Sequence, residues 1–141
     1  MIGLGTWQTF DVGSSAADRE PLRKVLSEFI LLGERVVDSS PMFGPSEHVT
    51  GDLAEELSAH NRLFLAAKVW TSGKEAEIRQ MEQSLARLRT SRIDILQVHN
   101  LVDYRTHLPT LRRWKEQGRV RYIGVTHFTE GAFDELANVI Q

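Results

Sequence analysis

Residues 63–99 read LFLAAKVWTSGKEAEIRQMEQSLARLRTSRIDILQVH, and two kinds of pattern alternate within this stretch. A short apolar run opens it and another closes it, and they end in the polar residues Lys68 and His99. Between the runs, apolar residues recur at the spacing of one helix face: Ile78, Met81, Leu85 and Leu88. A strand, a helix and a second strand over about 30 residues predict a βαβ unit. Ser72, with Glu75 three residues later, resembles a capping box at the start of this helix.

The same alternation extends outward in both directions. Val36-Val37 leads into Asp38, and Tyr122 to Val125 leads into Thr126, so that the four polar ends lie 30, 31 and 27 positions apart. A further run, Ile2 to Gly5, precedes Thr6 and Trp7. Strands joined by helical crossovers are parallel, and their carboxyl ends meet on one face. We therefore predict an α/β fold of about five parallel βα units in sequential order, with these polar ends side by side.

Composition narrows the class of protein. The 141 residues are 41% apolar and 26% charged, without a linker or low-complexity tract, which predicts a single domain over residues 1–141. The net charge of −2 gives no reason to expect nucleic acid. We interpret one basic stretch as a solvated face rather than an anion site: Arg112, Arg113, Lys115, Arg119 and Arg121.

The sequence also bears on location and metals. It contains no cysteine, which excludes disulfides and Cys-ligated zinc, and no apolar run approaches the length of a membrane span. His48, His60 and His107 have no ligand-type partner four residues away, so we expect no metal site. A cytoplasmic protein without membrane contact is expected. The chain enters a strand at once, which suggests that the natural amino terminus, with any export signal, lies upstream.

The polar strand ends carry the candidate chemistry. A lysine directly after a buried strand seeks a carboxylate, and Asp38 at the neighbouring strand end is the natural partner for Lys68. The pair is either structural or able to tune a neighbouring acid. His99 shares the repeat position and could donate a hydrogen bond to a substrate oxygen, or satisfy a backbone group. Aromatic residues beyond the strand ends suggest the walls of an apolar pocket: Trp7, Phe43 and Trp70.

Five motifs, in order and spacing, resemble the first five barrel strands of the aldo-keto reductases. They are GLGTW at 3–7, VDSSPMFGPSE at 37–47, AAKVW at 66–70, DILQVHN at 94–100 and YIGVT at 122–126. The resemblance covers nearly the whole chain. It implies a TIM-type (β/α) barrel that binds NADP(H) across its carboxyl-terminal face. Hydride would pass between this cofactor and a small carbonyl or alcohol substrate.

The resemblance also assigns the family's catalytic tetrad to Asp38, Phe43, Lys68 and His99. Phe43 stands where the family has a tyrosine that gives its proton to the carbonyl oxygen, and a phenyl ring has no proton to give. Of the two tyrosines in the chain, only Tyr104 is expected near this face, and we do not expect it to replace the missing acid. The resemblance places Thr6, Trp7 and Asp38 near the nicotinamide ribose and Thr126 with His127 near the carboxamide. It places the substrate among Trp7, Phe43, Trp70 and His99.

Length is the second departure from the family pattern. A complete barrel has eight strands in about 200 residues or more, and this chain supplies five. We therefore expect a partial TIM-type barrel, a half-built cofactor site, and self-association through unpaired sheet edges. The isolated chain is expected to have negligible reductase activity.

Two other readings of the sequence stay open. Five βα units in about 140 residues also suit a flavodoxin-like signalling module, whose strand order would be 2-1-3-4-5 instead of 1-2-3-4-5. A non-catalytic relative that binds a nucleotide or a partner would suit the phenylalanine at position 43. The physiological substrate, the preference for NADP over NAD and the oligomeric state do not follow from the sequence.

Overall fold

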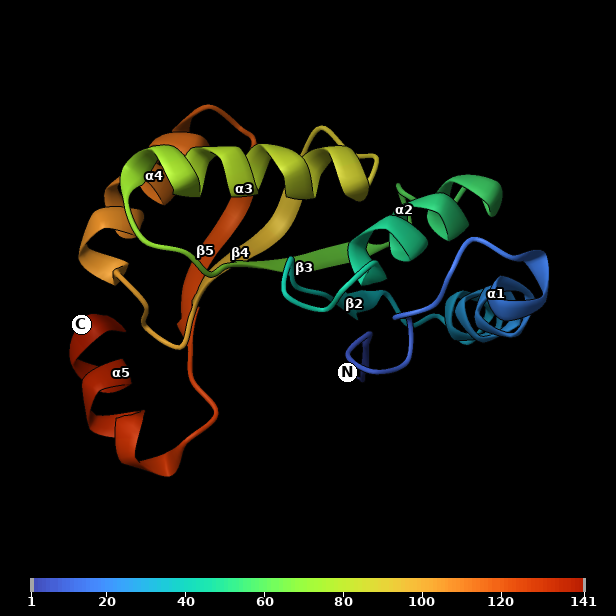
Figure 1. The fold of residues 1–141 in the computed structure, drawn as a ribbon, viewed down its shortest axis with the longest axis horizontal. Helices are drawn as coiled ribbons and strands as arrows, with labels where there is room; N and C mark the ends of the chain where they lie inside the picture. Colours follow the sequence, from blue (N-terminus) through green and yellow to red (C-terminus); the bar gives the residue numbers. More distant parts are fainter. Residues whose placement is uncertain (1, 141) are drawn as a thin grey trace.

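The computed structural model describes residues 2–140, and five strands in it form one parallel sheet (Figure 1). The strands are β1 (Gly3–Gly5), β2 (Val36–Asp38), β3 (Phe64–Val69), β4 (Ile93–His99) and β5 (Val120–Thr126). They pair in the order β1-β2-β3-β4-β5. This sequential order confirms the predicted arrangement of βα units. It also excludes the flavodoxin-like alternative, in which β1 would lie between β2 and β3.

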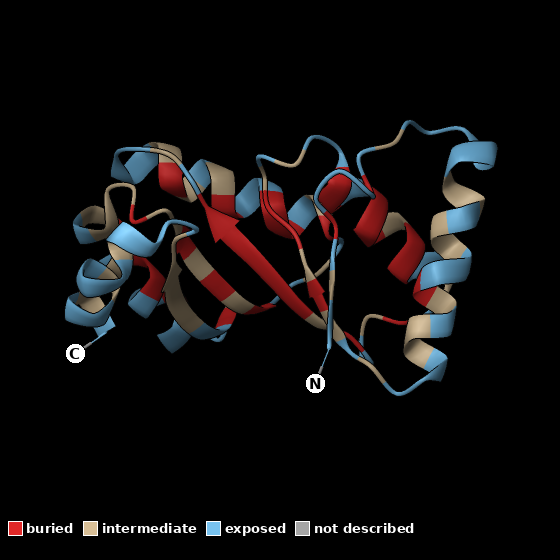
Figure 2. Cartoon of the chain, turned by 90° about the horizontal axis from the view of Figure 1, so that it is seen from below, coloured by how far each residue is buried: buried red, intermediate tan, exposed pale blue. Residues whose placement is uncertain are grey.

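Helices follow the strands and form the second layer. They are α1 (Ala16–Leu31), α2 (Ser46–Glu56), α3 (Lys74–Arg87), α4 (Tyr104–Glu116) and α5 (Phe133–Ile140), the last preceded by the 3-10 turn η1 (Glu130–Ala132). Each of the first three helices contacts the next, and α5 lies at the far end of the sheet from α1 (Figure 1). The apolar core fills the space between this helical layer and the sheet, and β3 is buried along nearly its whole length (Figure 2).

Side chains alternate between the two faces of the sheet. Leu65, Ala67 and Val69 of β3 belong to the core under the helices, so Ala66 and Lys68 point to the opposite face. The register pairs Asp38 with Ala66, Ala66 with Ile95, and His99 with Thr126. Asp38, Lys68, His99 and Thr126 therefore share one face at the carboxyl ends of their strands, as the repeat predicts.

At Gly51, α2 approaches the backbone at the end of α3 closely. A methyl group here would overlap the carbonyl oxygen of Arg87 and lie 2.8 Å from the carbonyl carbon of Leu88. Only glycine lets α2 lie directly against the end of α3. This contact fixes the position of α2, and with it the loop that precedes α2.

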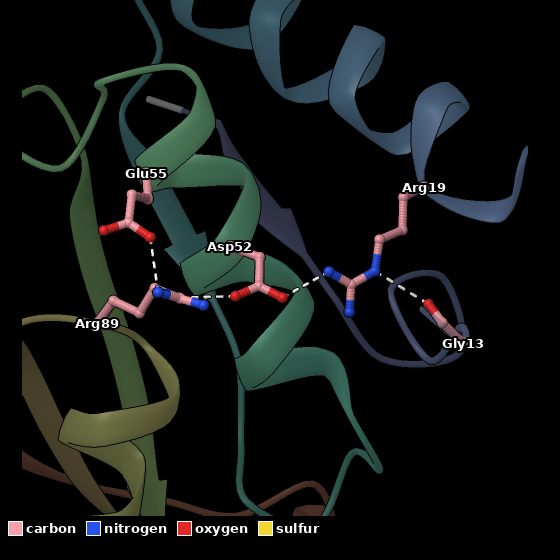
Figure 3. A network of polar contacts seen from close by, with 5 residues as sticks. All are labelled: Gly13, Arg19, Asp52, Glu55 and Arg89. Carbon is pink, nitrogen blue, oxygen red and sulfur yellow. Dashed lines mark hydrogen bonds and ion pairs between the residues drawn. The ribbon is translucent and has the colours of Figure 1, made fainter. Parts of the chain in front are cut away.

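A polar network joins three further segments around α2 (Figure 3). Asp52 accepts hydrogen bonds from Arg19 of α1 and, at 2.7 Å, from Arg89 after α3. Arg19 Nε also donates to the carbonyl oxygen of Gly13 at 3.0 Å, and Arg89 Nη1 donates to Glu55 at 2.7 Å. The network holds the connection before α1 against α2 on the outer surface of the molecule.

The beginning of α3 differs from the capping box expected at Ser72 and Glu75. Gly73 is the N-cap residue, with a φ of 83°, and no side chain caps the helix from within. Instead, the carboxylate of Asp103, in the connection after β4, accepts a hydrogen bond of 2.8 Å from the Gly73 N–H. A carboxylate from another βα connection therefore replaces the local cap.

The sheet is open among residues 2–140. β1 pairs with β2 alone and β5 with β4 alone, so one edge of each strand has no partner strand in the described part of the chain. Within the same range, no helix combines the length and the apolar character that crossing a membrane requires. The architecture is five consecutive units of a (β/α) barrel, bounded by two free edges.

Candidate active site

The Lys68 ammonium is the centre of the site. Its Nζ lies 2.7 and 2.8 Å from the two carboxylate oxygens of Asp38 and 3.0 Å from the carbonyl oxygen of Ser39. The Lys68 side chain is 8% exposed, whereas that of Asp38 is 39% exposed. An ammonium has three N–H donors, and these three acceptors take all of them. The predicted pair is present, and Lys68 has no free donor.

Phe43 lies over this pair. The Lys68 Nζ is 5.5 Å from the centre of the Phe43 ring, within the range of a cation–π contact. The loop between β2 and α2 holds the ring in place, because the Phe43 N–H donates to Ser40 at 3.0 Å and Gly44 takes a φ of 55°. An added Cβ at Gly44 would also lie 2.9 Å from the Asp11 carboxyl carbon. The left-handed backbone at position 44, with the Asp11 carboxylate beside it, therefore favours glycine.

His99 completes the group from the end of β4. Its ring centre lies 6.4 Å from that of Phe43, and the two rings meet edge to face at 87°. Burial lowers the pKa of His99 below its ordinary value, and the nearby Lys68 ammonium lowers it further. Its Nδ1 is buried and has no hydrogen-bond partner among the described residues. The imidazole is thus neutral at pH 7, with one nitrogen unengaged.

An apolar cavity of about 400 Å³ opens beside these rings. Its lining comprises Trp7, Met42, Phe43, His99, Asn100 and Phe128. Trp70, which the sequence suggests as a pocket wall, is 43% exposed and is not among these residues. The sequence did not predict Met42, Asn100 and Phe128 as lining residues, although each is the neighbour of a predicted site residue. Adjacency to Phe43, His99 and His127 was the available signal.

The residues expected to contact a cofactor lie around the same opening but differ in solvent exposure. Thr6 is fully buried, and its hydroxyl lies 3.0 Å from both the Asp38 carbonyl oxygen and the Ser39 hydroxyl. Trp7 is largely exposed and packs 6.3 Å from Phe43. Thr126 pairs with His99 in the sheet. His127 Nδ1 accepts from the N–H of Thr129 at 3.1 Å.

Tyr104, the one other phenol considered for this face, lies outside the site. Tyr104 begins α4 and packs against the core under the helices rather than lining the cavity. No cluster of three or more potential metal ligands occurs in residues 2–140. The side chains gathered at this end of the sheet are thus an ion pair with a buried ammonium, a neutral imidazole and a set of aromatic rings. This combination suits an apolar molecule with one polar atom better than a metal ion.

Comparison with known proteins agrees with this geometry. The model of the Aldo/keto reductase family matches residues 1–140. The chain belongs to the aldo/keto reductase family. Among curated members, it is 27% identical to aldo-keto reductase YhdN of Bacillus subtilis, over 98% of this chain and 46% of the relative. It is 28% identical to methylglyoxal reductase YeaE of Escherichia coli, over 96% of this chain and 48% of the relative.

Solved structures of aldo-keto reductases share the fold. An aldo/keto reductase from Klebsiella pneumoniae in complex with NADP and acetate superposes with a TM-score of 0.79 at 28% identity, over 96% of this chain and 48% of that chain. Another structure of an aldo-keto reductase from Klebsiella pneumoniae, in complex with NADPH, gives a TM-score of 0.77 at 29% identity, with the same coverage. The chain thus spans about half the length of the aldo-keto reductases that it matches.

Proposed function

We propose that this chain forms the catalytic-face part of an NADP(H)-dependent aldo-keto reductase whose proton-transfer step is impaired by Phe43. One observation carries the proposal: the ring of Phe43 lies over an assembled Asp38–Lys68 ion pair and against His99. The pair and the imidazole are the groups that would assist a phenolic acid at this position. The phenol itself is replaced by a hydrocarbon ring.

The residues present fit one end of a nicotinamide cofactor. An aromatic face at Trp7 and a cavity of about 400 Å³ beside His99 offer room for a flat ring and a small carbonyl compound. Trp7, Asp38, Thr126 and His127 would hold the cofactor, and buried Thr6 would support Asp38 from behind. NADPH, when bound, supplies the hydride for carbonyl reduction. The NADP complexes of the Klebsiella pneumoniae relatives support this assignment.

The chain's own part in the reaction is to stabilise and protonate the carbonyl oxygen as it gains negative charge. Lys68 cannot give a proton there without breaking one of its three hydrogen bonds, and neutral His99 is a hydrogen-bond donor rather than a strong acid. Loss of a positioned general acid typically slows such a step by about 10²- to 10⁴-fold. Substrate binding does not need that proton. We therefore expect binding to survive where turnover is slow.

The test joins residues 1–140 to the carboxyl-terminal half of a reductase relative such as YeaE and compares Phe43→Tyr with the unaltered chain. NADPH binding, followed by cofactor fluorescence, should be the same in both. Turnover of a small aldehyde should rise at least about tenfold in the tyrosine variant. Phe43→Leu is the matched control and should gain nothing. A hybrid that binds NADPH but does not respond to the tyrosine contradicts the proposal.

Phe43 also favours a second candidate function, in which the protein binds a nucleotide or a partner without catalysing a reaction. The same hybrid separates the two functions. Retained NADPH affinity together with a gain below about tenfold for Phe43→Tyr would assign the binding role. Three further expectations stay predictions. They are that the substrate is a small carbonyl or alcohol, that the chain self-associates through the free sheet edges, and that the protein is cytoplasmic.

A further inference from the structure

A second cavity, of about 530 Å³, lies at the amino-terminal end of the sheet. Arginines from the beginnings of four consecutive strands contribute to its lining: Arg35, Arg62, Arg92 and Arg121. The sequence pattern placed Arg121 on a solvated basic face, and its position in this lining revises that interpretation for Arg121. We propose that this cavity is a binding site for a small phosphate-bearing anion. It lies at the opposite end of the strands from the Asp38–Lys68 pair and is independent of the proposed reductase function.

The balance of charge in the cavity favours an anion. Asp94 is the single carboxylate in the lining. Its Oδ2 accepts from the Leu65 N–H at 2.9 Å, and its Oδ1 lies 3.8 Å from Arg92 Nη2 and 3.9 Å from Arg121 Nη1. These last separations exceed hydrogen-bond distance. One carboxylate, already engaged by the backbone, therefore faces two guanidinium groups and satisfies neither.

The other two arginines have no acidic partner. Arg35 and Arg62 form no ion pair within residues 2–140, although Arg62 Nη2 donates to the carbonyl oxygen of Leu57 at 3.1 Å. Both residues are exposed and open to a ligand. Four guanidinium groups against one carboxylate leave a local excess of about three positive charges at pH 7. A bound dianion or trianion would relieve the repulsion among them.

The scaffold under these arginines is fixed by backbone contacts. The carbonyl oxygen of Arg35 accepts from the Phe64 N–H at 2.8 Å, which ties the beginning of β2 to that of β3. Thr90 Oγ1 contacts both the N–H and the carbonyl oxygen of Arg92, at 3.3 and 2.9 Å. Guanidinium forks match phosphate oxygens in geometry as well as in charge. The cavity volume suits a phosphate or diphosphate with a small attached group.

The test is isothermal titration of the 141-residue chain with inorganic pyrophosphate at constant ionic strength. The unaltered chain should bind it saturably. The double variant Arg35→Gln/Arg62→Gln should lose at least about tenfold in affinity, because it removes two charge-assisted contacts. Its fold should persist, since neither arginine takes part in an ion pair, and the thermal transition followed by circular dichroism checks this.

Two further variants make the result specific. Arg79→Gln/Arg113→Gln changes the net charge equally but lies on α3 and α4, away from the cavity, and should alter affinity by less than about twofold. Asp94→Asn keeps an oxygen for the Leu65 N–H while removing the competing charge, so affinity should increase. The absence of saturable binding, an equal loss in both double variants, or weaker binding by Asp94→Asn would overturn the proposal.

Discussion

At Lys68, three N–H donors meet three acceptors, and this saturation explains how an ammonium is held at 8% exposure. The two partners of the ion pair differ in burial, because the Asp38 side chain is 39% exposed. Water can therefore solvate the carboxylate if the lysine is removed, but it cannot readily reach the ammonium if the carboxylate is removed. Loss of Asp38 should therefore cost more stability than loss of Lys68.

This asymmetry predicts unequal costs for two substitutions. Asp38→Asn should lower the free energy of unfolding by about 2–4 kcal/mol, because it leaves a buried charge without its counterion. Lys68→Met should cost less than about 1 kcal/mol, since the apolar stem is kept and Asp38 stays partly solvated. Urea unfolding at pH 7 measures both values. Equal costs would contradict the described burial of the pair.

His99 gives a prediction about pH. Burial lowers its pKa in the folded state, so the unfolded chain takes up a proton first as the pH falls. The contribution of His99 to stability is complete above the unfolded-state pKa of about 6.5 and is lost as the pH falls toward the folded-state pKa. Below that value it stays constant. His99→Gln should remove this part of the pH dependence of urea unfolding, and an unchanged slope would contradict the shift.

The sequence predicted the polar group at the strand ends better than it predicted the other residues that line the cavity. Asp38, Lys68 and His99 were identifiable because each ends an apolar run in the same phase of a repeat, and parallel strands bring such residues together. Asn100 and Phe128 line the cavity from connections without a period, so only their adjacency to His99 and His127 could have indicated them. The saturation of Lys68 by the Ser39 carbonyl oxygen depends on loop geometry, which residue spacing does not specify.

At the scale of helices and strands, close contacts between neighbouring units set the geometry. Gly51 brings α2 against the end of α3, and Asp103 from the connection after β4 holds the Gly73 N–H at the start of α3. The number and order of elements followed from apolar periodicity. The cap of α3 did not, because the group that provides it lies 30 residues away in the chain. Local sequence motifs cannot report such a partner.

The contact at Gly51 predicts a large loss of stability on adding one methyl group. Gly51→Ala should lower the free energy of unfolding by about 3 kcal/mol or more, because the new carbon meets rigid backbone rather than a flexible side chain. Gly131→Ala is the matched control, since an added Cβ there meets nothing within 4 Å, and it should change stability by less than about 0.5 kcal/mol. Urea unfolding compares them; similar values would show that α2 and α3 can separate freely.

At the scale of the whole molecule, the dominant feature is a sheet with two free edges. β1 and β5 each expose one row of backbone N–H and C=O groups, and α5 has no buried residue among its eight. In a closed barrel, neither edge would exist. The sequence predicted this openness from its count of five units. The sequence did not show which surfaces the open sheet exposes. The structure shows them through the register of the strands and the placement of α5.

The open sheet predicts that the 141-residue chain self-associates and has negligible reductase activity. Size-exclusion chromatography with light scattering should give a mass above the 16.0 kDa of the monomer, increasing with concentration. Carbonyl-dependent NADPH oxidation should stay at background, because half of the barrel face is lacking. A stable monomer, or turnover at an ordinary enzymatic rate of about 1 s⁻¹ or more, would contradict this expectation.

We propose that Phe43 occupies the place of the acid in a site whose other members, Asp38, Lys68 and His99, are assembled and able to work. The sharpest test is a double-variant comparison in the reductase hybrid, which measures aldehyde turnover for Phe43→Tyr with and without Lys68→Met. We expect a gain of at least about tenfold from the tyrosine when Lys68 is present, and loss of most of that gain when it is absent. The same gain with and without Lys68, or no gain in either background, would contradict it.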